Sequence, residues 1–333
     1  MKIAINGMGR IGRAALKVIL DTDGLELVAI NDIVSIENLA YLLKYDTVYG
    51  KYEHDVTHNT DSFTIKGNMI MYTSERNPEL LSWGELGIDL VIESTGIFTE
   101  YEGAEKHIKA GAKTVIISAP TKSKEAPTVV HGVNTQTGHT SIFSCASCTT
   151  NNISPIVEIL GRRIGVKKAI MTTVHAYTAS QPAVDGPSKK NFRMGRAGAA
   201  NIVPTTTGAA IATTKALPEY EGRFDGVAIR VPIPVGSLSD MTFVMDTDVT
   251  VEEVNSILKE EATSERYKDI VDTTYDPIVS SDIIKSPYAS TVDLSMTRVV
   301  DGDLLKIMTW YDNEWGFTNQ MIRQIIDIKN NKS

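Results

Sequence analysis

The sequence predicts an α/β protein with two domains: an N-terminal doubly wound domain, then an α+β domain with a mostly antiparallel sheet. The first strand-like run passes through a glycine-rich turn into a helical pattern, which is typical of parallel sheets with crossover helices. The second half contains long alternating runs, which are typical of antiparallel strands. A length of 333 residues also fits two domains.

The composition is that of an ordinary globular protein, with 42% hydrophobic and 22% charged residues. The net charge of -8 argues against nucleic acid or an anionic membrane as the main partner. Two cysteines argue against a disulfide scaffold and favour a reducing, cytoplasmic compartment. No secretory pattern opens the chain, and no apolar run approaches the ~18 residues of a membrane span. We expect no metal site.

A dinucleotide-binding turn is predicted near the N-terminus. A short apolar strand, residues 2–6, runs into a turn with Gly7, Gly9 and Gly12, and the next strand ends at Asp32. In this Rossmann pattern the glycines permit a tight turn, close approach of a pyrophosphate and close helix–strand packing. Asp32 would accept hydrogen bonds from a ribose and repel a 2′-phosphate, so NAD is favoured over NADP. A glycine-rich turn beside a solvated aspartate is the alternative.

Two further apolar runs, residues 89–93 and 114–118, fit the same parallel sheet, and each ends in small polar residues. Ligands of such sheets lie beyond the carboxyl ends of the strands. We therefore expect cofactor contacts in the turns that follow, together with Arg76; ordinary turn residues are the alternative. Residues 49–71 alternate polar and apolar side chains and are expected to form a hairpin excursion.

A cysteine is predicted at the start of a helix. The apolar run at 141–145 ends in small and hydroxyl-bearing residues, and a helical pattern follows. Ser147 is a candidate N-cap, so the helix either begins there and passes Pro155 or begins late, at Pro155 itself. Backbone N–H groups and the helix dipole would favour the thiolate of Cys148, which makes it a candidate nucleophile. A buried structural thiol is the alternative.

The second half opens with a strand at 169–174 that is closed by His175, a candidate base or a structural histidine. The loop-like stretch at 177–200 is long enough to indicate a functional or interface segment. The remaining runs are expected to complete the sheet and add a final amphipathic helix: 227–232, 238–245, 251–258, 304–310 and, for the helix, 318–328.

A dinucleotide site and a thiolate together indicate one reaction. The thiolate adds to an aldehyde to give a hemithioacetal, a hydride leaves to the nicotinamide, and a thioester remains. A base must take the proton, and His175 is the obvious candidate.

The chain resembles the phosphorylating glyceraldehyde-3-phosphate dehydrogenases over essentially its whole length. The segments that carry this resemblance are Ile5-Asn6-Gly7-Met8-Gly9-Arg10-Ile11-Gly12-Arg13, Tyr41-Leu42-Leu43-Lys44-Tyr45-Asp46, Glu93-Ser94-Thr95-Gly96, Ile117-Ser118-Ala119-Pro120, Ala146-Ser147-Cys148-Thr149-Thr150-Asn151, His175-Ala176-Tyr177-Thr178, Asn201-Ile202-Val203-Pro204-Thr205-Thr206-Thr207-Gly208-Ala209-Ala210 and Trp310-Tyr311-Asp312-Asn313-Glu314-Trp315-Gly316.

The resemblance implies a role for each candidate residue. Cys148 corresponds to the nucleophile, and His175 to the group that activates it and helps to stabilise the oxyanion. Thr178 and Arg230 would hold the substrate's phosphate. Four residues would hold the attacking inorganic phosphate, or exchange with the first site: Ser147, Thr149, Thr207 and Gly208. Contacts with NAD are implied for Gly7, Gly9, Arg10, Ile11, Gly12, Asp32, Arg76, Thr95, Gly96, Ser118 and, at the nicotinamide carboxamide, Asn313.

The resemblance also implies a cytoplasmic homotetramer that acts on glyceraldehyde 3-phosphate in glycolysis and gluconeogenesis. Residues 1–147 would bind NAD, completed by the C-terminal helix within residues 313–333, and residues 148–312 would form the catalytic domain. Erythrose-4-phosphate dehydrogenase, a sibling that releases an acid, is an alternative. A non-catalytic NAD-binding or moonlighting protein is another.

Several residues depart from the family pattern. Cys145 stands where the family usually has Asn, and Asn152 where many members have a second Cys. Ser180 replaces a frequent Asp, and Met194 a frequent Arg. The Cys-x-x-Cys pair gives a hypothesis that mild oxidation closes a Cys145–Cys148 disulfide, provided that the two Cβ directions are compatible.

Overall fold

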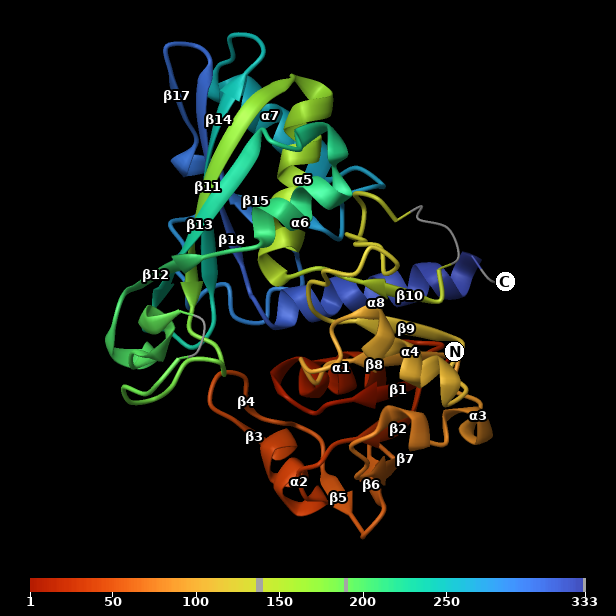
Figure 1. The fold of residues 1–333 in the computed structure, drawn as a ribbon. Helices are drawn as coiled ribbons and strands as arrows, with labels where there is room; N and C mark the ends of the chain where they lie inside the picture. Colours follow the sequence, from red (N-terminus) through yellow and green to blue (C-terminus); the bar gives the residue numbers. More distant parts are fainter. Residues whose placement is uncertain (136–139, 189–190, 332–333) are drawn as a thin grey trace. The chain divides into compact units, whose positions relative to one another are not determined.

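The computed structural model describes residues 1–135, 140–188 and 191–331. Contacts divide the chain into two compact units, which are described separately (Figure 1). Unit 1 consists of Met1–Val129, Thr135–Ala146 and Met321–Ser333, and unit 2 of Val130–Asn134 and Ser147–Gln320. None of the helices in the described residues is long and apolar enough to cross a membrane.

Unit 1 is built on an eight-stranded sheet with the strand order β10-β9-β8-β1-β2-β7-β6-β5. Its parallel strands are β1 (Lys2–Asn6), β2 (Glu26–Asn31), β7 (Asn68–Thr73), β8 (Leu90–Glu93), β9 (Thr114–Ile117) and β10 (Ile142–Ser144). The antiparallel edge, β5 (Val56–His58) and β6 (Ser62–Ile65), contains the hairpin that the alternation predicts. The order around β1 is that of a doubly wound sheet, so the predicted fold class of this half is confirmed.

Helices pack against this sheet because its central strands, β1, β8 and β9, are apolar and buried on both faces. They are α1 (Arg10–Leu20), α2 (Ile36–Lys44), α3 (Trp83–Leu86) and α4 (Tyr101–Lys109), with a 3-10 turn, η1 (Pro78–Leu80), and a small ribbon of β3 (Tyr45–Asp46) and β4 (Gly50–Lys51). One core cluster joins Val91 and Val115 of the central strands to Trp83 and Ala104 of the helices. The final turns of α8 (Trp315–Asn331), from Met321 onward, also belong to this unit.

Unit 2 is built on a second eight-stranded sheet, in the order β12-β13-β11-β14-β18-β16-β15, with β17 paired to β18. Its strands are β11 (Val166–Ala176), β12 (Val203–Thr206), β13 (Phe224–Val231), β14 (Ser237–Met245), β15 (Val271–Thr274), β16 (Ser290–Asp293), β17 (Arg298–Val300) and β18 (Leu304–Tyr311). Among the strands that the structure describes, only the β11–β13 and β15–β16 pairs are parallel, which confirms the mostly antiparallel sheet.

One face of this sheet is covered and the other is open. Met241 and Phe243 alternate along β14 with residues of the other face and are buried with Ile156 and Leu160 of α5 (Cys148–Arg163). The helices α6 (Ala209–Ala216) and α7 (Val251–Ala262) contribute to the same core (Figure 1). On the opposite face Ile170 is 59% and Val227 is 49% exposed in the single chain. Short 3-10 turns complete the unit: η2 (Phe192–Gly195), η3 (Gly198–Ala200), η4 (Pro218–Tyr220) and η5 (Leu294–Met296).

The prediction that residues 251–258 complete the sheet is wrong, because they form helix α7. The Thr250 side chain accepts a hydrogen bond from the Glu253 N–H, and Val254 and Leu258 place their side chains on one buried face. The structure also shows where the helix near Cys148 begins. Helix α5 starts at Cys148, directly after Ser147, and continues through Pro155.

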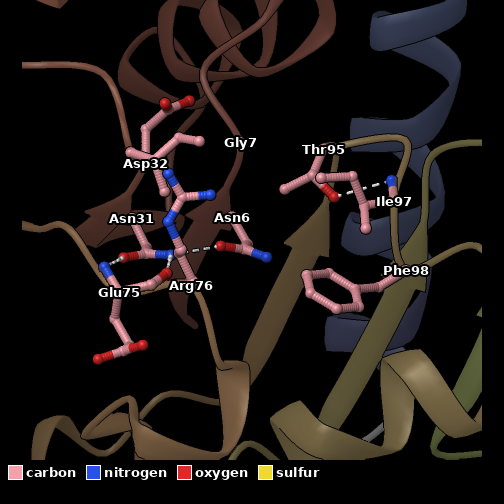
Figure 2. Close-up of a pocket in the computed structure, with 10 residues that line it drawn as sticks. Asn6, Gly7, Asn31, Asp32, Glu75, Arg76, Thr95, Ile97 and Phe98 are labelled. Carbon is pink, nitrogen blue, oxygen red and sulfur yellow. Dashed lines mark hydrogen bonds between the residues drawn. The ribbon is translucent and has the colours of Figure 1, made fainter.

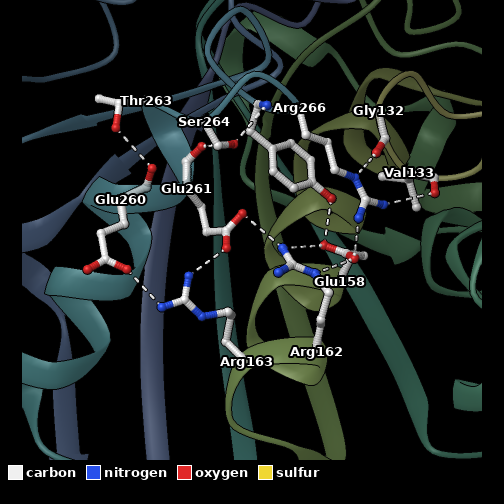
Figure 3. Close-up of polar contacts among 11 residues, drawn as sticks. Gly132, Val133, Glu158, Arg162, Arg163, Glu260, Glu261, Thr263, Ser264 and Arg266 are labelled. Carbon is white, nitrogen blue, oxygen red and sulfur yellow. Dashed lines mark hydrogen bonds and ion pairs between the residues drawn. The ribbon is translucent and has the colours of Figure 1, made fainter.

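A cluster of ion pairs joins α5 to α7 and to the segment that follows it (Figure 3). Glu158 binds Arg162 and Arg266 and accepts the Tyr267 hydroxyl, while Glu261 binds Arg162 and Arg163. Arg266 also donates to the carbonyl oxygens of Gly132 and Val133, at 2.7 and 3.2 Å. This arginine therefore fixes the 130–134 segment within unit 2.

Candidate functional site

A cavity of about 390 Å³ lies at the carboxyl ends of β1, β2, β7 and β8 (Figure 2). This edge is where ligands bind in sheets of this type. Its walls come from the last residues of these strands and from the turns that follow them: Asn6, Gly7, Asn31, Asp32, Ile33, Glu75, Arg76, Thr95, Ile97 and Phe98. The pocket thus brings together Gly7, Asp32, Arg76 and Thr95, which the sequence predicts as cofactor contacts.

The glycines of the first turn are required by close contacts. Gly7 has φ +97°, and a Cβ atom there would lie 2.6 Å from the Thr95 nitrogen. A Cβ atom on Gly12 would lie 2.0 Å from the Gly7 carbonyl oxygen. Gly9, the N-cap of α1, faces open space instead, so its backbone is accessible to a ligand. This is the arrangement in which a helix N-terminus meets a pyrophosphate.

Asp32 holds the loop around the pocket as well as lining it. Its carboxylate accepts hydrogen bonds from the Met8 N–H at 2.6 Å and the Val34 N–H at 2.9 Å. Each of its oxygens keeps a second lone pair, so the carboxylate can still accept a hydroxyl group of a ribose.

Other predicted cofactor residues lie around these turns. Arg10 forms an ion pair with Asp46 at 2.5 Å and lies over the Tyr49 ring, so its guanidinium fixes the 46–49 turn. Ile11 follows it in the first turn of α1. Gly96, at φ +72°, lies between Thr95 and Ile97, and the Ser118 hydroxyl donates to the Glu93 carbonyl at the end of β8.

The catalytic candidate lies in unit 2, at a sharp turn between a strand and a helix. Ala146 has a positive φ of 61°, which is rare for a residue with a side chain. The Ser147 hydroxyl then accepts a hydrogen bond from the Thr150 N–H, which confirms the predicted N-cap. Cys148 is consequently the first residue of α5, at the positive end of the helix dipole.

His175 lies beside this thiol because of the strand register. Its Nε2 is 3.4 Å from the Cys148 Sγ. Strands β11 and β13 run parallel with His175 opposite Arg230, and the Arg230 Nη1 lies 2.6 Å from the His175 Nδ1. The same Nη1 donates to the Ala176 carbonyl at 2.9 Å. The structure thus brings together three predicted site residues: a thiol, an imidazole and a guanidinium.

The surroundings of His175 permit both tautomers. When Nδ1 donates to the Ala176 carbonyl, 2.7 Å away, Nε2 has a lone pair and can accept the proton of Cys148. When Arg230 donates to Nδ1, the proton is on Nε2 and can be donated. The same ring can therefore take a proton or give a hydrogen bond at the Cys148 side.

The environment acts on both titrating groups. Burial, reinforced by the Arg230 charge, lowers the pKa of His175 to about 3, so the ring is neutral at neutral pH. Burial raises the pKa of the half-buried Cys148 thiol above its ordinary value, although Arg230 and Thr149 oppose this. Desolvation of the Cys148 thiol therefore opposes the thiolate form that the helix terminus is predicted to favour.

Tyr311 supports this group from β18, and the sequence alone did not single it out. Its ring meets His175 edge-on at 5.9 Å. Its hydroxyl lies 2.9 Å from the Thr149 hydroxyl and 2.8 Å from the Thr173 hydroxyl. The only signal for it was its place within the aromatic run before Asn313.

The predicted anion-binding residues occupy separate turns of unit 2. Thr178 lies two residues beyond β11, and its hydroxyl contacts Ser180 at 2.9 Å. Thr207 and Gly208 precede α6, where the Thr207 hydroxyl accepts the Ala209 N–H and Gly208 faces open space. No hydrogen bond joins these three residues to Cys148 in the part of the chain that the structure describes.

Asn313 is buried at the end of β18, and its carboxamide oxygen accepts hydrogen bonds from the Gly236 N–H and the Ser237 hydroxyl. The orientation of its carboxamide is therefore fixed by protein contacts.

The two cysteines lie in different environments, and they are not joined in a disulfide. Cys145 is 2% exposed, and its Sγ donates to the Ile117 carbonyl at 3.3 Å. Burial raises the pKa of Cys145 to about 12. Asn152, which also departs from the family pattern, is buried as well. Its amide donates to the Ala289 carbonyl and accepts the Thr309 hydroxyl.

Comparison with known proteins gives one answer for the whole chain. The model of the glyceraldehyde 3-phosphate dehydrogenase NAD binding domain matches residues 1–101, and that of the glyceraldehyde 3-phosphate dehydrogenase C-terminal domain matches residues 147–313. A glyceraldehyde-3-phosphate dehydrogenase of Streptomyces coelicolor is 46% identical over 99% of both chains. Those of Clostridium pasteurianum and Zymomonas mobilis are 44% and 45% identical over 97% of this chain and 97% and 96% of theirs.

Proposed function

The chain belongs to the glyceraldehyde-3-phosphate dehydrogenase family, and we propose that it converts glyceraldehyde 3-phosphate, NAD and inorganic phosphate into an acyl phosphate and NADH. Members of this family are NAD-dependent oxidoreductases that act on an aldehyde. The observation that carries the proposal is the 3.4 Å contact between the Cys148 Sγ and the His175 Nε2, with Arg230 behind the ring.

In the first step the Cys148 sulfur attacks the aldehyde carbon. Burial raises the pKa of Cys148, and the thiol proton passes to the neutral His175 as the carbon–sulfur bond forms. The backbone N–H of Cys148, together with the protonated Nε2, would stabilise the oxyanion of the hemithioacetal.

In the second step the hemithioacetal loses a hydride and becomes a thioester on Cys148. Bound NAD supplies the hydride acceptor. The residues of unit 1 fit this cofactor: the open backbone at Gly9 suits the pyrophosphate and Asp32 the ribose, with Arg10, Ile11, Gly12, Arg76, Thr95, Gly96 and Ser118 around them. We assign Asn313, whose carboxamide orientation is fixed, to the nicotinamide.

In the third step inorganic phosphate attacks the thioester, and the Cys148 thiol leaves. Arg230 is the strongest candidate to hold a phosphate, because its buried Nε has no partner in the described residues. A phosphate oxygen would satisfy that donor. Thr178 would share the substrate phosphate with Arg230, and the hydroxyls and N–H groups of Ser147, Thr149, Thr207 and Gly208 would receive the attacking phosphate.

The test is NADH formation from glyceraldehyde 3-phosphate, with and without inorganic phosphate. We expect steady turnover with phosphate, a single burst without it, and neither in Cys148→Ser. Equal steady rates in both conditions would mean that water cleaves the thioester, and erythrose 4-phosphate would then be the substrate to try. Binding of NAD without any turnover would instead indicate a non-catalytic protein.

We also propose that the protein is a cytoplasmic homotetramer that works in glycolysis and gluconeogenesis. The open face of the unit 2 sheet, with Ile170 and Val227, is apolar enough to be covered by a second copy. Functionally, residues 1–147 with the helix in 313–333 would bind NAD, and residues 148–312 would carry the chemistry. Sedimentation of the purified protein tests the assembly, since a monomer would contradict it.

A further inference from the structure

A buried carboxylate lies beneath the nucleotide pocket of unit 1. Glu93, the last residue of β8, is 2% exposed and has no role in the reaction described above. One of its oxygens accepts hydrogen bonds from the N–H and the hydroxyl of Thr95. The other lies 2.6 Å from the Asn6 Nδ2 and 3.0 Å from the His107 Nε2. Four donors thus converge on one carboxylate.

His107 and Trp83 fix the direction of these hydrogen bonds. The Trp83 Nε1 lies 3.0 Å from the His107 Nδ1, and an indole N–H can only donate. The His107 Nδ1 must therefore accept, which leaves the ring proton on Nε2, where it donates to Glu93. Both rings are fully buried and stack with their centroids 6.3 Å apart. This pair consequently supplies a donor to Glu93 that cannot reverse.

The direction continues from Glu93 to the walls of the pocket. Because Asn6 donates to Glu93, its Oδ1 is left to accept from the Asn31 Nδ2, at 2.7 Å. The Asn31 Oδ1 then accepts the Glu75 N–H at 2.8 Å, and both amides line the pocket in Figure 2. On the other side, the Thr95 hydroxyl oxygen accepts the Ile97 N–H at 3.1 Å. The turns after four adjacent strands are therefore held by one chain of hydrogen bonds.

We propose that Glu93 and His107 are positioning residues for the dinucleotide, which set the orientation of Asn6, Asn31 and Thr95 through this one-way chain. The inference rests on the proposed function only in taking NAD as the ligand of the pocket. Glu93 itself is covered and does not touch the ligand. Its contribution is to keep the pocket walls in one arrangement before binding.

Glu93→Gln is the decisive change. An amide nitrogen replaces one carboxylate oxygen, so it faces either the two donors of Thr95 or the donors of Asn6 and His107. In the first case the Thr95 N–H, which can only donate, loses its acceptor. In the second case the Asn6 and His107 donors lose theirs, because Asn31 and Trp83 fix the direction of both groups. We expect the Kd for NAD to rise about tenfold, with kcat at saturating NAD and the KM for inorganic phosphate within about twofold of the wild type.

A second change tests the direction of the chain. Trp83→Phe removes the indole donor, so His107 can move its proton to Nδ1 and accept from the new amide through Nε2. In the Glu93→Gln background, Trp83→Phe should therefore lower the Kd for NAD about threefold. In the wild-type background the same change should leave the Kd for NAD unchanged or raise it. Such non-additivity is not expected if the residues only support the fold.

The control is Asp89→Asn, the same chemical change at the other end of β8. Asp89 accepts the Lys2 N–H and the Lys113 ammonium but has no link to the pocket, so the Kd for NAD should not change. An unchanged Kd in Glu93→Gln, with or without lower thermal stability, would overturn the proposal. So would additive effects in the double variant. Wild-type protein that fails to bind NAD would instead refute the proposed function.

Discussion

The two thiols should differ sharply in reactivity, and alkylation can measure the difference. At about pH 8 a thiol whose pKa is about 12 is thiolate in only about one molecule in 10,000. Cys145 is also sealed from solvent and hydrogen-bonded to Ile117, so a reagent reaches it only when the surrounding core opens. Cys148 is half-buried, with His175 beside it to take the proton.

We therefore expect iodoacetamide to add one label per chain to the native protein, at Cys148, and at least about 100-fold more slowly at Cys145. Mass spectrometry of quenched samples gives the rate at each site. Protein unfolded in guanidinium should take two labels, Cys145→Ser should label like the wild type, and Cys148→Ser should stay unlabelled.

Comparable labelling of both thiols in the native protein would refute this reasoning. A second result would also refute the reasoning. If a mild oxidant inactivated the wild type reversibly with DTT but had no effect on Cys145→Asn, a Cys145–Cys148 disulfide would have to form. The burial of Cys145 predicts the opposite: both proteins should respond alike.

Four other changes test the site and the fold. Arg230→Gln removes a positive charge that disfavours protonated His175 and favours ionised Cys148, so the pKa of each group should rise. The pH profile of Cys148 alkylation should therefore move to higher pH. An unchanged profile would count against an effect of the Arg230 charge on Cys148. Tyr311→Phe leaves two buried threonine hydroxyls without their partner and should lower the free energy of unfolding in urea by ~1–3 kcal/mol, with wild-type stability as the contrary result. Asp32→Ala should weaken the binding of NAD about tenfold and reduce the preference for NAD over NADP, which isothermal titration can measure. The same Kd for NAD in the variant and the wild type would contradict this. Burial raises the pKa of Glu261, but two arginines outweigh it and lower the pKa below 4.5; Glu261→Gln should therefore destabilise the protein at neutral pH, and the difference should vanish in acid as pH falls through the lowered value, which thermal melts at several pH values would show.

Local patterns predicted most of the fold. Three kinds of pattern depend only on neighbours in the sequence, and each appears in the structure. They are the strand–glycine–helix start, the apolar runs at 89–93 and 114–118, and the alternation along β14. The error at 251–258 was avoidable, because Thr250 and Glu253 have the spacing of a capping-box sequence and the apolar spacing is helical.

The site was predictable only as far as its residue types. The motif containing Cys148 and the strand ending at His175 pointed to both residues, but the pKa of each depends on burial that no local pattern reports. The carboxylate beneath the pocket was missed for the same reason: Glu93 and His107 are joined by tertiary packing, and His107 lies in an otherwise ordinary helix.

The path of the chain between the two units has a consequence for protein engineering. The backbone passes from one unit to the other after Val129, Asn134, Ala146 and Gln320. No single cut can therefore separate a cofactor-binding module from a catalytic one. An exchange of the cofactor module between two relatives would require three segments to be transplanted together, and a fragment that stops at residue 146 would lack the helical turns from Met321 onward.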